Sequence, residues 1–203
     1  MAAHLETDRY GAFLLTDAIR PARHVPVVPR EGWRRDVFRD AESGLSVPVL
    51  LAAVSRERLF DVFLGLLPPL GETVDVVLET SHEETEAVHR DLVREGIDLA
   101  VAMSHFCDEE ELLLNDGCTG VAVIGQEGRA EVQFDEHKLL AVYADDLGPY
   151  EAVLRRAGVP RVEGLRFLTE GEHLHSTTVE LERRFEELCQ RLGIEAEVLA
   201  GWR

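Results

Sequence analysis

The sequence predicts an α/β protein with a mixed, largely parallel sheet, flanking helices and one antiparallel hairpin near residues 119–134. Apolar, strand-like runs alternate with helical patterns, which is typical of β-α-β units with parallel strands. The hairpin is indicated by two strand-like runs on either side of Gly125–Gly128, a turn of four to five residues.

The first predicted unit is strand, helix, strand. Residues 47–54 read as a buried strand, and Ser55 is a candidate N-cap for the helix that follows. The pair Pro68-Pro69 ends that helix, because proline cannot continue it. Residues 73–79 form the second strand. A crossover of this kind predicts that the two strands are parallel neighbours.

The next segment predicts two helices separated by a strand. A capping box at residues 81–84 opens a helix that ends just before Gly96. Residues 97–103 are apolar enough for a third strand, and residues 108–114 for a short helical turn. These assignments continue the alternation of strand and helix.

A second β-α-β unit follows the hairpin. Residues 138–143 predict a strand, and Pro149 lies in the first turn of a helix that Gly158 closes. Residues 164–168 predict the returning strand. The last helix opens at the capping box Thr177–Glu180 and repeats apolar residues at helical spacing.

Charge and proline content divide the chain into two parts. Residues 1–42 predict an extended arm, because they contain seven Arg, seven acids and three prolines that prevent a continuous helix. Residues 43–203 predict a single α/β domain, which carries the whole net charge of −18. The arm is therefore neutral overall and locally basic, whereas the domain is strongly acidic.

Composition excludes several classes of protein. With 45% hydrophobic residues the 203-residue chain can bury a core, and its longest apolar run, residues 47–54, is far too short to cross a membrane. The negative charge disfavours direct binding of nucleic acid. The three cysteines form no CxxC pair, and the N-terminus lacks a secretory pattern, so we expect a cytoplasmic protein with reduced thiols.

Candidate ligand residues follow the predicted strands, because ligands of open parallel sheets gather beyond the carboxyl ends of strands. The candidate ligand-binding residues are Ser81, His82, Ser104, His105 and Asp145. The candidate metal ligands are His173 and His175, and the candidate catalytic residue is Glu172, which could activate a metal-bound water. Imidazole and carboxylate together suit zinc, manganese or iron.

The motif His173-Leu-His175 is the most suggestive of these features. In an extended backbone, residues two apart point to the same side, so both imidazoles could reach one ion. The alternative is a pair of solvated loop histidines, since the spacing determines no third ligand and a helix starts almost at once. Lys138, the only lysine, is interpreted as part of a charged turn between strands.

Two classes of function remain after these exclusions. The leading hypothesis is a non-enzymatic, self-associating interaction or regulatory module, a homo-oligomer in which the arginine-bearing arm docks on the acidic domain of a neighbour. The alternative is a metal-dependent hydrolase, or a small-molecule binding domain, that uses His, Asp and Glu at the strand ends. Convergence of the strand-end loops in space would favour the alternative.

Overall fold

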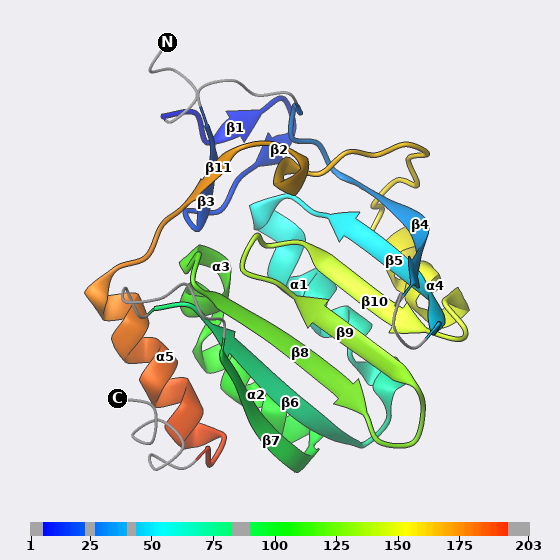
Figure 1. The fold of residues 1–203 in the computed structure, drawn as a ribbon, viewed down its shortest axis with the longest axis vertical. Helices are drawn as coiled ribbons and strands as arrows, with labels where there is room; N and C mark the ends of the chain where they lie inside the picture. Colours follow the sequence, from blue (N-terminus) through cyan, green and yellow to red (C-terminus); the bar gives the residue numbers. More distant parts are fainter. Residues whose placement is uncertain (1–5, 23–26, 40–43, 83–89, 195–203) are drawn as a thin grey trace.

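The computed structural model describes residues 6–22, 27–39, 44–82 and 90–194. Its main feature is a seven-stranded sheet in the order β4-β5-β10-β9-β8-β6-β7, in which every pair of neighbouring strands is antiparallel (Figure 1). The strands are β4 (Gly32–Arg39), β5 (Ser46–Ala53), β6 (Thr73–Thr80), β7 (Arg90–Asp98), β8 (Thr119–Gly125), β9 (Ala130–Phe134) and β10 (Leu140–Ala144).

The prediction of a largely parallel sheet is wrong. The strands β5 and β6, joined by a helix as expected, do run in the same direction, but β10, β9 and β8 lie between them. A helical crossover determines the relative direction of the strands that it joins, but not whether they become neighbours. The three later strands fill the gap and pair antiparallel throughout. The hairpin near residues 119–134 is confirmed as β8 and β9.

Two elements have the opposite type from the prediction. The strand β7 covers Arg90–Asp98, although the sequence predicted a helix from residues 81–84 to just before Gly96. Residues 83–89 of that predicted helix lie outside the described ranges. The predicted strand over residues 97–103 is instead the start of α2 (Leu99–Asp108). The helix begins there because the Asp98 carboxylate accepts hydrogen bonds from the backbone N–H groups of Ala100 and Val101.

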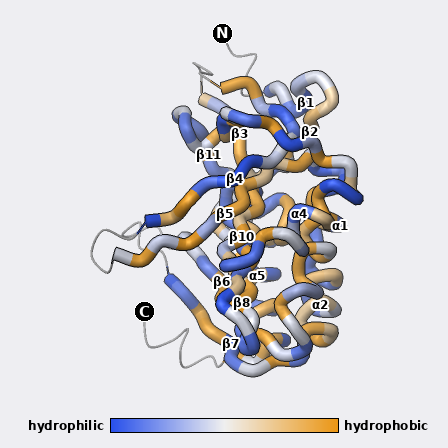
Figure 2. The backbone as a smooth tube through the Cα atoms, turned by 90° about the vertical axis from the view of Figure 1, so that its right-hand side faces the viewer, coloured by the Kyte–Doolittle hydropathy of each residue, from blue (hydrophilic) through white to orange (hydrophobic). Residues whose placement is uncertain are grey.

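The helices cover one face of the sheet, and the other face carries none of α1, α2 and α4 (Figures 1 and 2). Most predicted helices are confirmed: α1 (Arg56–Leu66), α3 (Glu110–Asn115), α4 (Gly148–Arg156) and α5 (Val179–Arg191). The predicted strand over 164–168 is not formed, and a short 3-10 helix, η2 (Leu168–Glu170), ends that segment. Another, η1 (Pro68–Leu70), follows α1.

The main core lies between the sheet and these helices. Its largest fully buried side chains include Trp33, Phe63, Phe106 and Phe134. Phe63 of α1 lies at the centre, with ring centroids 5.1 Å from Phe134 and 5.7 Å from Phe106. Burial of such aromatic side chains stabilises the sheet against the helix layer by about 2–3 kcal/mol each.

A second, smaller layer lies beyond one end of the sheet (Figure 1). We call it the N-terminal layer; it contains β1 (Arg9–Tyr10), β2 (Phe13–Leu14), β3 (Ile19–Pro21) and β11 (His173–His175). The strand β11 pairs antiparallel with β3. A separate apolar cluster, which includes Phe13, Ile19 and Phe167, joins this layer to the carboxyl end of β5.

No helix within the described residues is long and apolar enough to span a membrane. 

Candidate metal centre

Three histidines meet where the N-terminal layer faces the end of the sheet. His173 and His175 come from β11, and His137 comes from the turn between β9 and β10. Their ring centroids are 4.8–5.1 Å apart, and one ring nitrogen from each residue lies within 4.8 Å of the others. We call these three residues the metal cluster.

The sequence explains the position of each imidazole. Because β11 is extended, His173 and His175 lie on the same side of the strand, with exposed Leu174 on the other. His137 lies in a tight turn that is closed by a hydrogen bond from the Lys138 N–H to the Asp135 carbonyl. Lys138 takes the left-handed conformation (φ 63°) that this turn requires, a position that glycine usually occupies.

Every ring of the metal cluster has its Nδ1 next to a hydrogen-bond acceptor. His173 Nδ1 is 2.7 Å from the Gly171 carbonyl oxygen, and His175 Nδ1 is 2.5 Å from the Gly117 carbonyl oxygen. His137 Nδ1 is 3.3 Å from Asp135 Oδ2. A carbonyl can only accept, so Nδ1 carries the proton in the first two rings. Nε2 then retains its lone pair, as in histidines that bind metals.

The two acids beside His137 face its Nδ1. Asp135 uses both carboxylate oxygens, because Oδ2 faces His137 Nδ1 and Oδ1 accepts a 2.7 Å hydrogen bond from the Leu139 N–H. Glu136 Oε1 is 3.5 Å from the same Nδ1. Both acids therefore contact His137, and neither joins the group of His137, His173 and His175.

The electrostatics of the metal cluster differ from ring to ring. Burial lowers the pKa of His137, but the hydrogen bond to Asp135 and the negative charges of Asp135 and Glu136 outweigh it, so its pKa is raised. Burial and the positive charges of His137 and His173 lower the pKa of His175. His137 is therefore protonated more easily than an ordinary histidine, and His175 is protonated less easily.

A second group lies nearby, and we call it the loop cluster: His82, Asp116 and Cys118. His82 follows β6, and Asp116 and Cys118 precede β8, which pairs with β6. Both ring nitrogens of His82 face protein atoms: Nδ1 is 2.7 Å from Thr80 Oγ1, and Nε2 lies 2.8 Å from Asp116 Oδ2 without the geometry of a hydrogen bond. The Asp116 carboxylate therefore occupies the approach to Nε2.

Asp116 is the centre of the loop cluster. It is completely buried, and besides His82 its carboxylate accepts hydrogen bonds from the Thr119 hydroxyl and the Cys118 N–H. Burial raises its pKa, but hydrogen bonds from His82, Thr119 and Thr177 outweigh burial and lower it. Burial raises the pKa of the Cys118 thiol, so this sulfur is protonated at neutral pH.

Gly117 connects the two clusters. Its carbonyl accepts from His175 Nδ1, and its N–H donates a 2.8 Å hydrogen bond to the Ser176 carbonyl. A Cβ at this position would approach the Ser176 nitrogen to 2.9 Å and would also overlap the Ala18 carbonyl oxygen. Only glycine lets the loop lie this close to β11 and β3.

The remaining candidates from the sequence are not brought to the metal cluster. Ser104 and His105 lie inside α2, and Asp145 follows β10, at the end opposite the turn that carries His137. Antiparallel strands place their carboxyl ends alternately at the two ends of the sheet, so the loops do not all converge. His82 belongs to the loop cluster, Ser81 lies beside it, and exposed Glu172 directly precedes β11.

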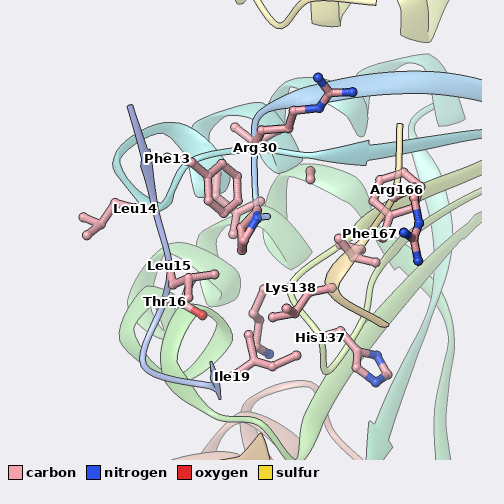
Figure 3. Close-up of a pocket in the computed structure, with 16 residues that line it drawn as sticks. Phe13, Leu14, Leu15, Thr16, Ile19, Arg30, His137, Lys138, Arg166 and Phe167 are labelled. Atoms are coloured by element: carbon pink, nitrogen blue, oxygen red, sulfur yellow. The ribbon is translucent and has the colours of Figure 1, made fainter. Parts of the chain in front are cut away.

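His137 and Asp116 were missed as site residues. The spacing of 36 residues between His137 and His173 carries no signal, because only the packing of β11 against the β9–β10 turn brings them together. Lys138 lies in the charged turn between β9 and β10, as predicted, but it is buried rather than exposed: the residue is 5% exposed, and its Nζ donates a 2.8 Å hydrogen bond to the Thr119 carbonyl. Figure 3 shows Lys138 among the apolar residues of a cavity, with His137 at its edge.

Comparison of the chain with protein-family models, with curated proteins and with solved structures finds no match. The case for a function therefore rests on the side chains of the metal cluster.

Proposed function

We propose that this protein binds one divalent transition-metal ion through Nε2 of His137, His173 and His175, with zinc as the preferred ion. The observation that carries the proposal is the acceptor beside every Nδ1, which holds each ring in the tautomer that a metal needs. Three neutral imidazoles suit zinc, copper or nickel better than magnesium or calcium, which prefer oxygen ligands.

The distances between the ring nitrogens require the three histidines to move slightly closer together when the ion binds. Zinc–nitrogen bonds of about 2.0–2.1 Å in a tetrahedral site separate the ligand nitrogens by about 3.4 Å. The ring nitrogens of the metal cluster lie within 4.8 Å of one another. Because His175 is exposed and the other two rings are half-buried, rotation of the side chains supplies this movement.

The proposal is tested by metal analysis of the full chain purified without an affinity tag, followed by titration of the chelator-treated protein with zinc. We expect one ion per chain, and loss of binding in the His173→Ala/His175→Ala double variant. The matched control is His105→Ala, which removes a histidine of α2 outside the metal cluster. Zinc binding that survives the double variant, or no binding in the wild type, would refute the proposal.

The alternative of an arm that docks on a neighbouring copy is not favoured by these contacts. Four arginines of residues 1–42 have an acidic partner in their own chain: Arg9 with Glu57, Arg20 with Asp17, Arg34 with Asp36, and Arg35 with Glu151. Residues 32–39 of the predicted arm form the edge strand β4. Two of these pairs, Arg9 with Glu57 and Arg35 with Glu151, join the arm to the acidic domain of the same chain.

A further inference from the structure

We infer that the ion held by the metal cluster keeps one coordination position open to water and hydrolyses small, uncharged esters. The inference rests on the proposed function and adds to it a reaction and a class of substrate. Its basis is the position of the polar groups around the three rings.

The described residues offer no fourth protein ligand on the Nε2 side. The two nearest acids, Asp135 and Glu136, form a group of potential ligand atoms with His137 alone, and neither joins the group of His137, His173 and His175. Structural zinc sites are closed by four protein ligands, whereas sites with three protein ligands leave a position for water. The metal cluster has the second pattern.

The open position is accessible from solvent. His175 is exposed, and His137 and His173 are half-buried, so water and a small substrate can reach an ion between them. Three neutral ligands leave the full double positive charge on the ion. Such an ion lowers the pKa of a bound water to about 7 and polarises a carbonyl oxygen.

The charges around the metal cluster select the class of substrate. Asp135 and Glu136 are adjacent to His137 and Glu172 is adjacent to His173, in a chain of net charge −18. This field repels phosphate esters and other anions and leaves uncharged carbonyl compounds unaffected. The cavity that touches His137 is only about 30 Å³, which is too small for an ester, so the substrate is bound at the surface.

The reaction needs no reactant besides water. The activated water gives one proton to the solvent, its oxygen forms a bond to the acyl carbon, and the bond from that carbon to the alcohol oxygen breaks. The electron pair of the broken bond leaves with the alcohol oxygen, which takes up a proton from water. The products are a carboxylic acid and an alcohol, and no atom changes its oxidation state.

The test uses the full chain, loaded with zinc or stripped of it, with p-nitrophenyl acetate as the uncharged substrate and p-nitrophenyl phosphate as the anionic one. We expect hydrolysis of the acetate at least about tenfold faster with zinc than without, and no zinc-dependent hydrolysis of the phosphate. The His173→Ala/His175→Ala variant should match the stripped protein, and His105→Ala should match the wild type.

A second measurement examines the open position without any turnover. Cobalt replaces zinc, and imidazole, an uncharged ligand, is added while the visible spectrum of the cobalt is recorded. A shift with imidazole supports an open position, and a spectrum that does not respond means that the protein fills it and overturns the inference.

The outcomes separate the two proposals. Stoichiometric zinc binding with no zinc-dependent ester hydrolysis overturns the inference and leaves the proposed function intact. Absence of zinc binding overturns both. Faster hydrolysis of the phosphate than of the acetate overturns the assignment of uncharged substrates.

Discussion

The metal cluster and the loop cluster contain similar residues at similar distances, but they differ in which atoms are free. Both bring three potential ligand atoms within 4.8 Å of one another. Among the described residues each ring of the metal cluster faces an acceptor with Nδ1, whereas both ring nitrogens of His82 face a protein atom, Nδ1 at Thr80 and Nε2 at Asp116. What lies against Nε2, and not the proximity of the residues alone, therefore separates a candidate metal site from a structural network.

Substitution of His82 should give the largest change in stability. The His82→Ala variant leaves the completely buried Asp116 carboxylate without its histidine, and breaking a buried pair in this way costs about 3 kcal/mol of unfolding free energy. Urea denaturation measures this loss. Zinc stoichiometry should remain one ion per chain; loss of the ion, or a cost below about 1 kcal/mol, would show that the two clusters are not distinct in role.

For His175→Ala we expect a large change in zinc binding and a small change in stability. Removal of one of the three ligands should weaken zinc binding more than the 10- to 100-fold typical of an outer-shell change. Because His175 is exposed, the unfolding free energy of the zinc-free protein should change by less than about 1 kcal/mol. Calorimetric titration with zinc and denaturation of the stripped protein check both parts. A variant that binds zinc as tightly as the wild type would contradict the assignment.

A smaller effect on zinc binding is expected for Asp135→Asn. The asparagine oxygen can still accept from the Leu139 N–H, but the amide nitrogen that replaces Oδ2 cannot accept a proton from His137 Nδ1. Zinc affinity should fall about 10- to 100-fold, which corresponds to about 1.4–2.8 kcal/mol. The matched control is Asp145→Asn, at the opposite end of the sheet, where no change is expected.

The last expected effect is confined to the pH dependence of stability and concerns Lys138, which links the two clusters by following His137 in the chain and bonding to Thr119 through Nζ. Burial lowers its pKa to about 8 from 10.5, so the unfolded chain binds the proton more tightly than the folded protein does. Stability should therefore rise with pH, by about 2 kcal/mol between pH 7 and 9.5. In Lys138→Met this rise should be absent, and the difference between the two denaturation curves measures it. An unchanged pH dependence in the variant would show that Lys138 does not titrate in this window.

Local patterns were sufficient to determine several elements of this protein. The apolar faces of α1 and α5 and the hairpin of β8 and β9 all follow from residues close together in the chain, and the cap of α5 is Thr178, one residue after the predicted Thr177. The extended pair His173 and His175 has the same local basis. Helix caps, turns and side-chain alternation depend on near neighbours, so the sequence carries their signals directly.

Only the tertiary structure decided the order of the strands and the composition of the metal cluster. The crossover between β5 and β6 was recognisable, but the insertion of β10, β9 and β8 between them depends on pairing between distant segments. In the same way, His137 is the third member of the metal cluster because β11 packs against the β9–β10 turn. His82 is not a candidate metal ligand, because Asp116 lies against its Nε2. Periodicity describes which side of an element is buried, but contacts between distant segments decide which lone pairs stay free.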